Sequence, residues 1–178
     1  IIKMLHVVND ELAVESKGIY SIEKFIVARR IMYWQVYLHK TVLSAEYLLI
    51  YILKRAKELA KEGVPLFATP AFRTFLDRTV TLHDFKNEPE LLNQFAELDD
   101  FDVLTSVKVW KHHSDVVLSK LSGFMIDRKL LKIKMYSEPV SVSKLDELRT
   151  ELAKQWNITK DESAYFVYTD SIANSAYN

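Results

Sequence analysis

The stretch that decides the fold is IEKFIVARRIMYWQVYLHKTVLSAEYLLIYILKRAKELAKE, residues 22–62. It contains neither Pro nor Gly, and its apolar residues recur at helical spacing until the Gly-Val-Pro sequence at 63–65 ends the run. Ser21 is suited to be the N-cap of this segment, and Gly63 lies where a C-terminal cap is needed. The pattern therefore predicts one long helix over 21–62, or two helices with a kink between them.

One side of this segment combines cationic and aromatic side chains. At about 100° per residue, the following residues fall on the same side: Arg29, Tyr33, Tyr37 and Lys40. An Arg offers a planar fork to a phosphate, a Lys offers a point charge, and a Tyr offers a flat ring with a hydroxyl. This chemistry suits an anion that carries a ring. From the pattern alone, the favoured interpretation is still a helix packed by its aromatic residues, with Arg and Lys reaching to water.

The composition indicates an ordinary globular chain. Its 178 residues are 49% hydrophobic, which is enough for a core in one domain or one and a half. Lys and Arg total 24 against 24 Asp and Glu, so no global field favours nucleic acid or an acidic membrane. The absence of Cys excludes disulfides and thiolate chemistry, and it suits a reducing, cytoplasmic location. No uncharged apolar run reaches the roughly 18 residues of a membrane span.

The rest of the chain is predicted to be mainly α-helical, with two small exceptions. Residues 3–15 form a β-hairpin around the polar turn at Asn9 and Asp10, and the helical part extends from there to residue 131. Together, residues 1–131 are expected to be the C-terminal part of a helical domain. The second exception is a small C-terminal α+β region, residues 132–178.

In this C-terminal region, strands are expected at 132–136 and 164–168, on either side of an amphipathic helix over 143–156. The chain opens on Ile1 without an initiator Met, and it ends directly after a strand-like run. We therefore expect it to be a piece of a longer protein, with residues 132–178 truncated.

Two histidine-containing pairs have residue types that bind metals. His83-Asp84 ligates a divalent metal only where further His and Asp residues converge on it, and the favoured interpretation is a helix junction that Asp84 caps. His112 and His113 point about 100° apart on a helix, so they cannot grip one ion together. Three isolated Gly residues build no phosphate-binding loop. The chain by itself is predicted to hold neither a complete catalytic site nor a metal site.

Several of these segments resemble a known family. Residues 22–41, followed by Ala45 and Glu46, resemble the HD-domain phosphohydrolases and, among them, the deoxynucleoside triphosphate triphosphohydrolases. Residues 98–102 and 127–132 continue the similarity, so the resemblance covers most of the chain. It implies a helical HD-type fold. For the intact protein, it implies hydrolysis of a nucleotide phosphoester or triphosphate with a divalent metal ion that activates water.

The resemblance also assigns roles to individual residues. It places Arg29 against substrate phosphate, and Tyr33 and Tyr37 along the nucleotide pocket. Where the family has a Gln beside its pocket Tyr, this chain has Leu38, a departure that bears on base or sugar selectivity. A second set is implied to contact a regulatory nucleotide or another subunit: Lys17, His39, Lys40 and Arg128.

The family's metal ligands are an upstream His, a His-Asp pair and a later Asp, and all of them precede the hairpin that begins this chain. We therefore expect the chain alone to be inactive and to carry no cofactor, and the intact protein to be a homo-oligomer. The expected ligand is a nucleotide or another phosphorylated small molecule, whereas nucleic acid and membrane are not expected.

Two alternatives to an enzyme fragment stay open. One is a non-catalytic helical module that binds a regulatory nucleotide or a partner protein. The other is an oligomerisation domain that buries Trp34, Leu38 and Val42 against a second subunit.

Overall fold

The computed structural model describes residues 2–171, and it divides into two compact units. The first unit comprises the chain up to Leu43 together with Ser171, and the second comprises residues 44–170. Helices dominate both units, and the β-structure among the described residues is one short N-terminal hairpin. The predicted mainly α fold with an N-terminal hairpin is therefore confirmed.

The hairpin pairs β1 (Leu5–Val8) with β2 (Glu11–Val14) in antiparallel fashion, with Val8 opposite Glu11. Its two turn residues, Asn9 and Asp10, have φ values of 53° and 62°. Asn and Asp tolerate this left-handed conformation better than other non-Gly residues, and two such residues in succession form the type I′ turn that matches strand twist. The predicted turn is thus the one that forms.

The long apolar run forms the second of its two predicted alternatives, a pair of helices. Helix α1 (Ile19–Met32) continues into a π-helical segment (Tyr33–Tyr37), and α2 (Lys40–Lys61) begins after a break. The Leu38 N–H donates to the Tyr33 carbonyl at 2.9 Å, and Leu38 itself leaves the helical conformation. A single uninterrupted helix over 21–62 is not formed. The run contains no Gly or Pro, so the sequence carried no local signal for the position of this break.

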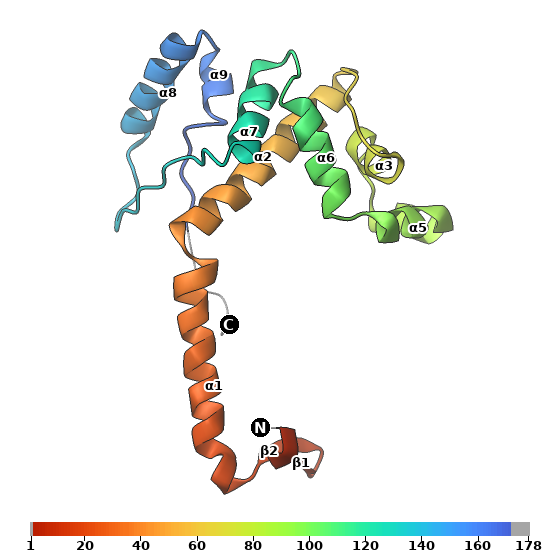
Figure 1. The fold of residues 1–178 in the computed structure, drawn as a ribbon, viewed down its shortest axis with the longest axis vertical. Coiled ribbons are helices and arrows are strands. Elements are labelled where there is room, and N and C mark those ends of the chain that lie inside the picture. The colour runs from red at the N-terminus through yellow and green to blue at the C-terminus, as the bar shows by residue number, and fades with distance from the viewer. Residues whose placement is uncertain (1, 172–178) are drawn as a thin grey trace. The chain divides into compact units, whose positions relative to one another are not determined.

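The core of the second unit forms around α2, with α6 (Asp100–Trp110) and α7 (Val116–Ile126) lying beside it (Figure 1). Helix α2 buries one face at the spacing expected of an amphipathic helix. The side chains of this face are Leu48, Ile52, Ala56 and Leu59. From the other helices, Val107, Trp110, Val117, Leu118 and Leu121 are fully or almost fully buried. Burial of each large apolar side chain contributes about 1.5–3 kcal/mol.

Capping residues set the starts of the shorter helices. Helices α3 (Pro70–Asp77) and α5 (Pro89–Glu97) begin with Pro, whose fixed φ suits the first turn. Helix α4 (Leu82–Asn87) begins with a capping box, and so does α6, where Asp99 accepts from the N–H groups of Phe101 and Asp102. Asp99 is therefore the N-cap that fixes the start of α6.

The C-terminal part of the second unit contains α8 (Val142–Trp156) and the short α9 (Lys160–Ser163). The predicted strands at 132–136 and 164–168 are not formed, so the described part of this region is helical rather than α+β. Residues 132–136 have no neighbouring strand to pair with, and the apolar side chains after α9 pack on helices instead. Phe166, for example, is buried with its ring centroid 4.9 Å from that of Trp156. Residues 172–178, on which the expected truncation rests, lie outside the described residues.

Within residues 2–171, no single helix is long and apolar enough to cross a membrane. The segments Ser16–Tyr37 and Lys40–Lys61 are long and apolar enough for a membrane span only when they are taken together across the break between them.

Candidate functional site

The structure brings together three residues of the predicted cationic and aromatic face. Arg29 lies in the last turn of α1, whereas Tyr33 and Tyr37 are the first and last residues of the π-helical segment. The guanidinium carbon of Arg29 is 5.8 Å from the ring centroid of Tyr33, and the two Tyr ring centroids are 5.1 Å apart. A planar cation and two phenol rings therefore form one continuous cluster. We call these three residues the Arg-Tyr cluster.

The Arg-Tyr cluster is accessible within its unit. Tyr33 is half-buried, whereas Arg29 and Tyr37 are exposed. π-Helical segments inside α-helices occur frequently at functional sites, because the extra residue interrupts regular packing. Here the interruption falls between the two Tyr residues of the cluster and is followed by the break before α2.

Lys40 does not continue the face as the spacing predicted. It is the first residue of α2, beyond the non-helical Leu38, so the progression of about 100° per residue does not extend from Tyr37 to Lys40. Its neighbour His39 accepts a hydrogen bond from the Thr41 N–H at 3.3 Å, which satisfies a free backbone N–H in the first turn of α2. Lys40 therefore lies on a different helix from the Arg-Tyr cluster, and the helical spacing no longer aligns it with that cluster.

The other two cations of the second predicted set lie in different surroundings. Lys17 follows the hairpin, and its ammonium is 2.5 Å from the Glu15 carboxylate, which also contacts His6 at 2.8 Å. These bonds, with Lys17 contributing most, lower the pKa of Glu15. Arg128 is exposed at the end of α7 in the second unit, with a φ of 56°.

One member of each His-containing pair bonds near the start of a helix. His112 and His113 follow the end of α6 at Trp110, so the prediction that they lie on a helix was wrong. The Asp84 carboxylate accepts from the Thr81 hydroxyl at 2.7 Å and the Thr81 N–H at 2.6 Å, which closes the capping box of α4 and lowers the pKa of Asp84. His113 Nδ1 accepts from the Asp115 N–H at 3.0 Å just before α7. The interpretation of His83-Asp84 as a capped helix junction is confirmed.

The residues described here do not fit the divalent metal ion that the resemblance implies. Within residues 2–171, no group of three or more His, Cys, Asp or Glu side chains is arranged to hold a metal ion. A divalent metal needs several oxygen or nitrogen ligands that converge on one point.

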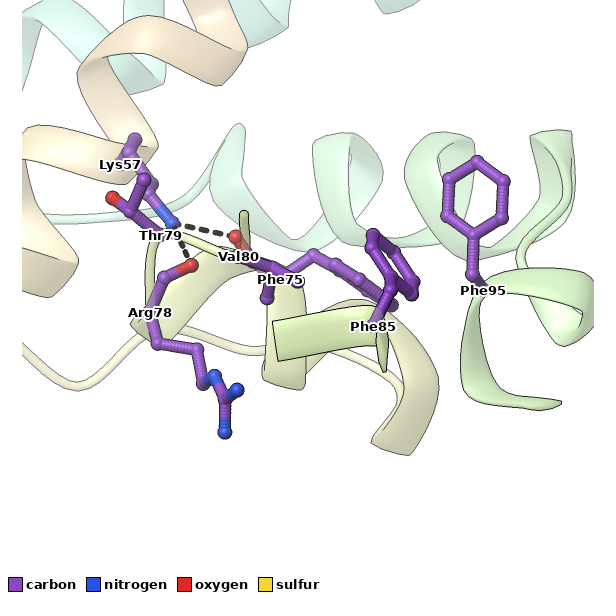
Figure 2. Close-up of a pocket in the computed structure, with 7 residues that line it drawn as sticks. All are labelled: Lys57, Phe75, Arg78, Thr79, Val80, Phe85 and Phe95. Carbon is purple, nitrogen blue, oxygen red and sulfur yellow. Dashed lines mark hydrogen bonds between the residues drawn. The ribbon is translucent and has the colours of Figure 1, made fainter. Parts of the chain in front are cut away.

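The second unit contains a hollow that the sequence did not predict (Figure 2). Its volume is about 310 Å³, and its lining comprises Lys57, Phe75, Arg78, Thr79, Val80, Phe85 and Phe95. The Lys57 ammonium lies at one end and the rings of Phe85 and Phe95 at the other (Figure 2). The centroids of the three Phe rings are 5.8–6.3 Å apart. In the sequence, this site is marked only by Lys57, a cation that follows Ala56 on the amphipathic helix. The structure shows that Ala56 is buried.

Both cations of the hollow are engaged in structural bonds. Lys57 Nζ donates to the carbonyls of Phe75 and Arg78, each at 2.6 Å. These carbonyls lie at the C-terminal end of α3, where a positive charge is favourable. Arg78 forms two hydrogen bonds with the Glu88 carboxylate, at 2.9 and 3.1 Å. Lys57 thus anchors α3 to α2.

Substitution of Lys57 by Met is expected to lower the free energy of unfolding by about 1.5–3 kcal/mol, because two carbonyls lose a charged donor. The measurement is urea unfolding of the chain, followed by circular dichroism. Lys61→Met is the matched control, since Lys61 is exposed on the same helix. Such a surface substitution is expected to change stability by less than about 0.5 kcal/mol. Equal midpoints for the two variants would contradict an anchoring role.

Comparison with known proteins shows what the chain resembles. Residues 1–63 match the family described as the HD associated region. The crystal structure of a phosphohydrolase from Bacteroides thetaiotaomicron VPI-5482 matches 98% of this chain with a TM-score of 0.92 and 50% sequence identity. The chain is thus similar to a phosphohydrolase along almost its whole length, and to the HD associated region over residues 1–63. The region matched by the HD associated family contains the whole Arg-Tyr cluster.

The chain spans less than half the length of its relatives. It covers 44% of the Bacteroides phosphohydrolase. A Bacillus subtilis (strain 168) protein, named as the uncharacterized protein YwfO, is 29% identical over 179 residues, which make up 100% of this chain and 38% of that protein.

Proposed function

We propose that this chain supplies the phosphate-binding and nucleotide-binding wall of a metal-dependent HD-type phosphohydrolase, with a deoxynucleoside triphosphate as substrate. The observation that carries the proposal is the Arg-Tyr cluster. It combines a cation suited to phosphate with two rings suited to a sugar or base, and it lies inside the segment that matches the HD associated region.

Each member of the cluster has a distinct task in this proposal. The Arg29 guanidinium donates to phosphate oxygens and balances the negative charge that develops on them during phosphoryl transfer. Tyr33 and Tyr37 pack their rings against the nucleoside and offer their hydroxyls to its polar groups. Leu38 has no side-chain donor or acceptor, so we expect packing rather than hydrogen bonding to act on the base or sugar at that position.

A divalent metal ion supplies activation of water in this family of enzymes. Because the described residues do not fit such an ion, we assign its ligands to polypeptide outside them. We also propose that Lys17, His39, Lys40 and Arg128 contact a regulatory nucleotide or another subunit in a cytoplasmic homo-oligomer. The zero net charge supports a small phosphorylated ligand rather than nucleic acid.

The test uses a chimera in which this chain replaces the matched 44% of the Bacteroides phosphohydrolase. Phosphate and triphosphate release are measured with the four deoxynucleoside triphosphates in the presence of Mg²⁺ or Mn²⁺. We expect turnover by the chimera and none by the 178-residue chain alone.

Two outcomes would contradict the proposal. Turnover by the 178-residue chain alone would show that metal ligands outside this chain are not needed. A chimera that hydrolyses only phosphoesters without a nucleoside would exclude the nucleotide as substrate, and it would leave Tyr33 and Tyr37 without their proposed ligand.

A further inference from the structure

The hollow in the second unit combines an aromatic wall with a cationic end at Lys57 (Figure 2). The three rings of the wall come from α3, α4 and α5. The Phe75 and Phe85 rings are nearly parallel, with 24° between their planes. The Phe95 ring is close to perpendicular to both, at 73° and 80°. The wall therefore offers ring faces and ring edges, the two surfaces against which a further aromatic ring packs.

The hollow is large enough for a ring with a short polar arm. Its volume is about 310 Å³. An apolar cavity of about 150 Å³ holds benzene, and binding sites for small molecules begin at about 300 Å³. Phe95 is 56% exposed, whereas Phe75 and Phe85 are half-buried, so the wall is accessible at Phe95.

Two polar donors at the cationic end have no partner within residues 2–171. An ammonium has three donors, and Lys57 uses two of them for the carbonyls of Phe75 and Arg78. Thr79 lines the same end, because the Arg78 carbonyl belongs to the peptide group that joins Arg78 to Thr79. Among the described residues, the Thr79 hydroxyl forms no hydrogen bond. One ammonium N–H and one hydroxyl are thus available to an acceptor in the hollow.

The positive charge of Lys57 has no ion-pair partner within the described part of the chain. The Asp77 carboxylate acts on Lys57 only from a distance, and it lies 3.8 Å from the Arg73 guanidinium instead. Arg78, the other cation of the hollow, already pairs with Glu88 at 2.9 Å. Burial lowers the pKa of Lys57. An anion next to the ammonium would therefore stabilise a charge that burial disfavours.

We propose that the hollow binds a small aromatic carboxylate. The carboxylate accepts from the Lys57 ammonium and the Thr79 hydroxyl, and the ring packs against Phe85 and Phe95. Two donors suit a singly charged carboxylate, whereas a phosphate carries more charge and more acceptor oxygens than they can satisfy. This site uses none of the residues of the Arg-Tyr cluster, so it does not depend on the proposed function.

The experiment uses phenylacetate as the probe and follows its binding to the 178-residue chain by nuclear magnetic resonance. We expect saturation with a Kd of about 0.1–1 mM, as is reasonable for so small a ligand, and shifted signals from the residues that line the hollow. The neutral 2-phenylacetamide should bind at least about 10-fold more weakly, because it loses a hydrogen bond between charged groups. Acetate should bind at least about 30-fold more weakly, because it buries no ring.

Three variants test the residues of the site. Phe95→Leu removes one ring but keeps an apolar side chain, so phenylacetate should bind about 3- to 10-fold more weakly. Phe101→Leu is the matched control, since Phe101 is 78% exposed on α6 and does not line the hollow, and it should leave Kd unchanged. In Lys57→Met, phenylacetate and 2-phenylacetamide should bind equally. The comparison of acid and amide in the wild-type chain applies even if Lys57→Met does not fold.

Four outcomes would overturn the proposal. Equal affinities of the wild-type chain for phenylacetate and 2-phenylacetamide would remove the Lys57 charge from the site. No saturation by either probe would show that the hollow is only a gap in the packing of α3, α4 and α5. Shifts centred on Tyr33 and Tyr37 would place the ligand at the Arg-Tyr cluster. Tighter binding of benzyl phosphate than of phenylacetate in the hollow would contradict the carboxylate as the ligand class.

Discussion

Replacing Arg29 with Ala should lower the turnover number of the chimera by about 100- to 1000-fold, the loss typical of removing one preorganised donor from a developing oxyanion. The structure places this guanidinium beside the Tyr33 ring, on a helix that continues through the π-helical segment. If Arg29 acts mainly on charge that develops in the transition state, kcat falls more than KM rises. Steady-state kinetics with a deoxynucleoside triphosphate separates the two constants.

Arg29→Lys should recover only part of the activity, because an ammonium keeps the charge and loses the planar two-pronged geometry that matches phosphate. Arg30→Ala is the matched control. Arg30 is exposed on the same turn and points about 100° away from Arg29, so its removal should change kcat by less than roughly threefold, within the effect of a surface substitution. Equal activity in the wild-type, Arg29→Ala and Arg29→Lys proteins would remove Arg29 from the site.

Replacing Asp115 with Ala should destabilise the second unit by about 3–5 kcal/mol, the cost of breaking a mostly buried ion pair by removing one partner. Arg55 donates to the two Asp115 oxygens at 3.2 and 2.6 Å, and the side chains are only 16% and 12% exposed. Asp115 also accepts from the Leu118 N–H at 2.7 Å as the N-cap of α7. Urea unfolding at pH 7 measures the loss.

The pH dependence of this pair has a definite sign. Burial alone would raise the pKa of Asp115, but the hydrogen bonds from Arg55 and the Leu118 N–H hold that pKa below its usual value. A carboxyl group whose pKa is lower in the folded state contributes stability above its unfolded pKa of about 3.9, and it loses that contribution as the pH falls through the folded pKa. The difference between wild type and Asp115→Asn should therefore shrink below about pH 4.

The control for Asp115 is Asp146→Ala, which removes an exposed pair with Lys160. Exposed ion pairs contribute about 0–1 kcal/mol. If Asp115→Ala costs no more than this control, or if the difference persists unchanged at pH 3, the Arg55 and Asp115 pair does not stabilise the fold as described.

The part of the fold that could be predicted depends on short-range interactions. The turn at Asn9 and Asp10 needs only residues that tolerate a positive φ. The capping box at Asp99 needs only an acceptor two and three residues before its donors. Asp84 was correctly interpreted as a helix cap for the same reason.

The part of the candidate site that could be predicted is the Arg-Tyr cluster, because spacing within one helix is enough to align Arg29, Tyr33 and Tyr37. Lys40 was wrongly placed on the same face, because the helix breaks at Leu38 and the spacing does not continue across the break. No Gly or Pro lies near Leu38, so the sequence did not indicate this break. The hollow around Lys57 was missed because its three Phe residues come from three different helices.

The sequence by itself determined the helical character of the chain and its N-terminal hairpin, which depend on neighbours within a few residues. The predicted N-cap Ser21 was wrong, because α1 begins at Ile19 and Ser21 lies inside it. Only the tertiary structure decided that residues 132–136 and 164–168 form no strands, and that Arg55 pairs with Asp115 across 60 positions of sequence. A strand needs a partner strand, and a buried ion pair needs a partner charge. Both come from distant segments, which local periodicity does not specify.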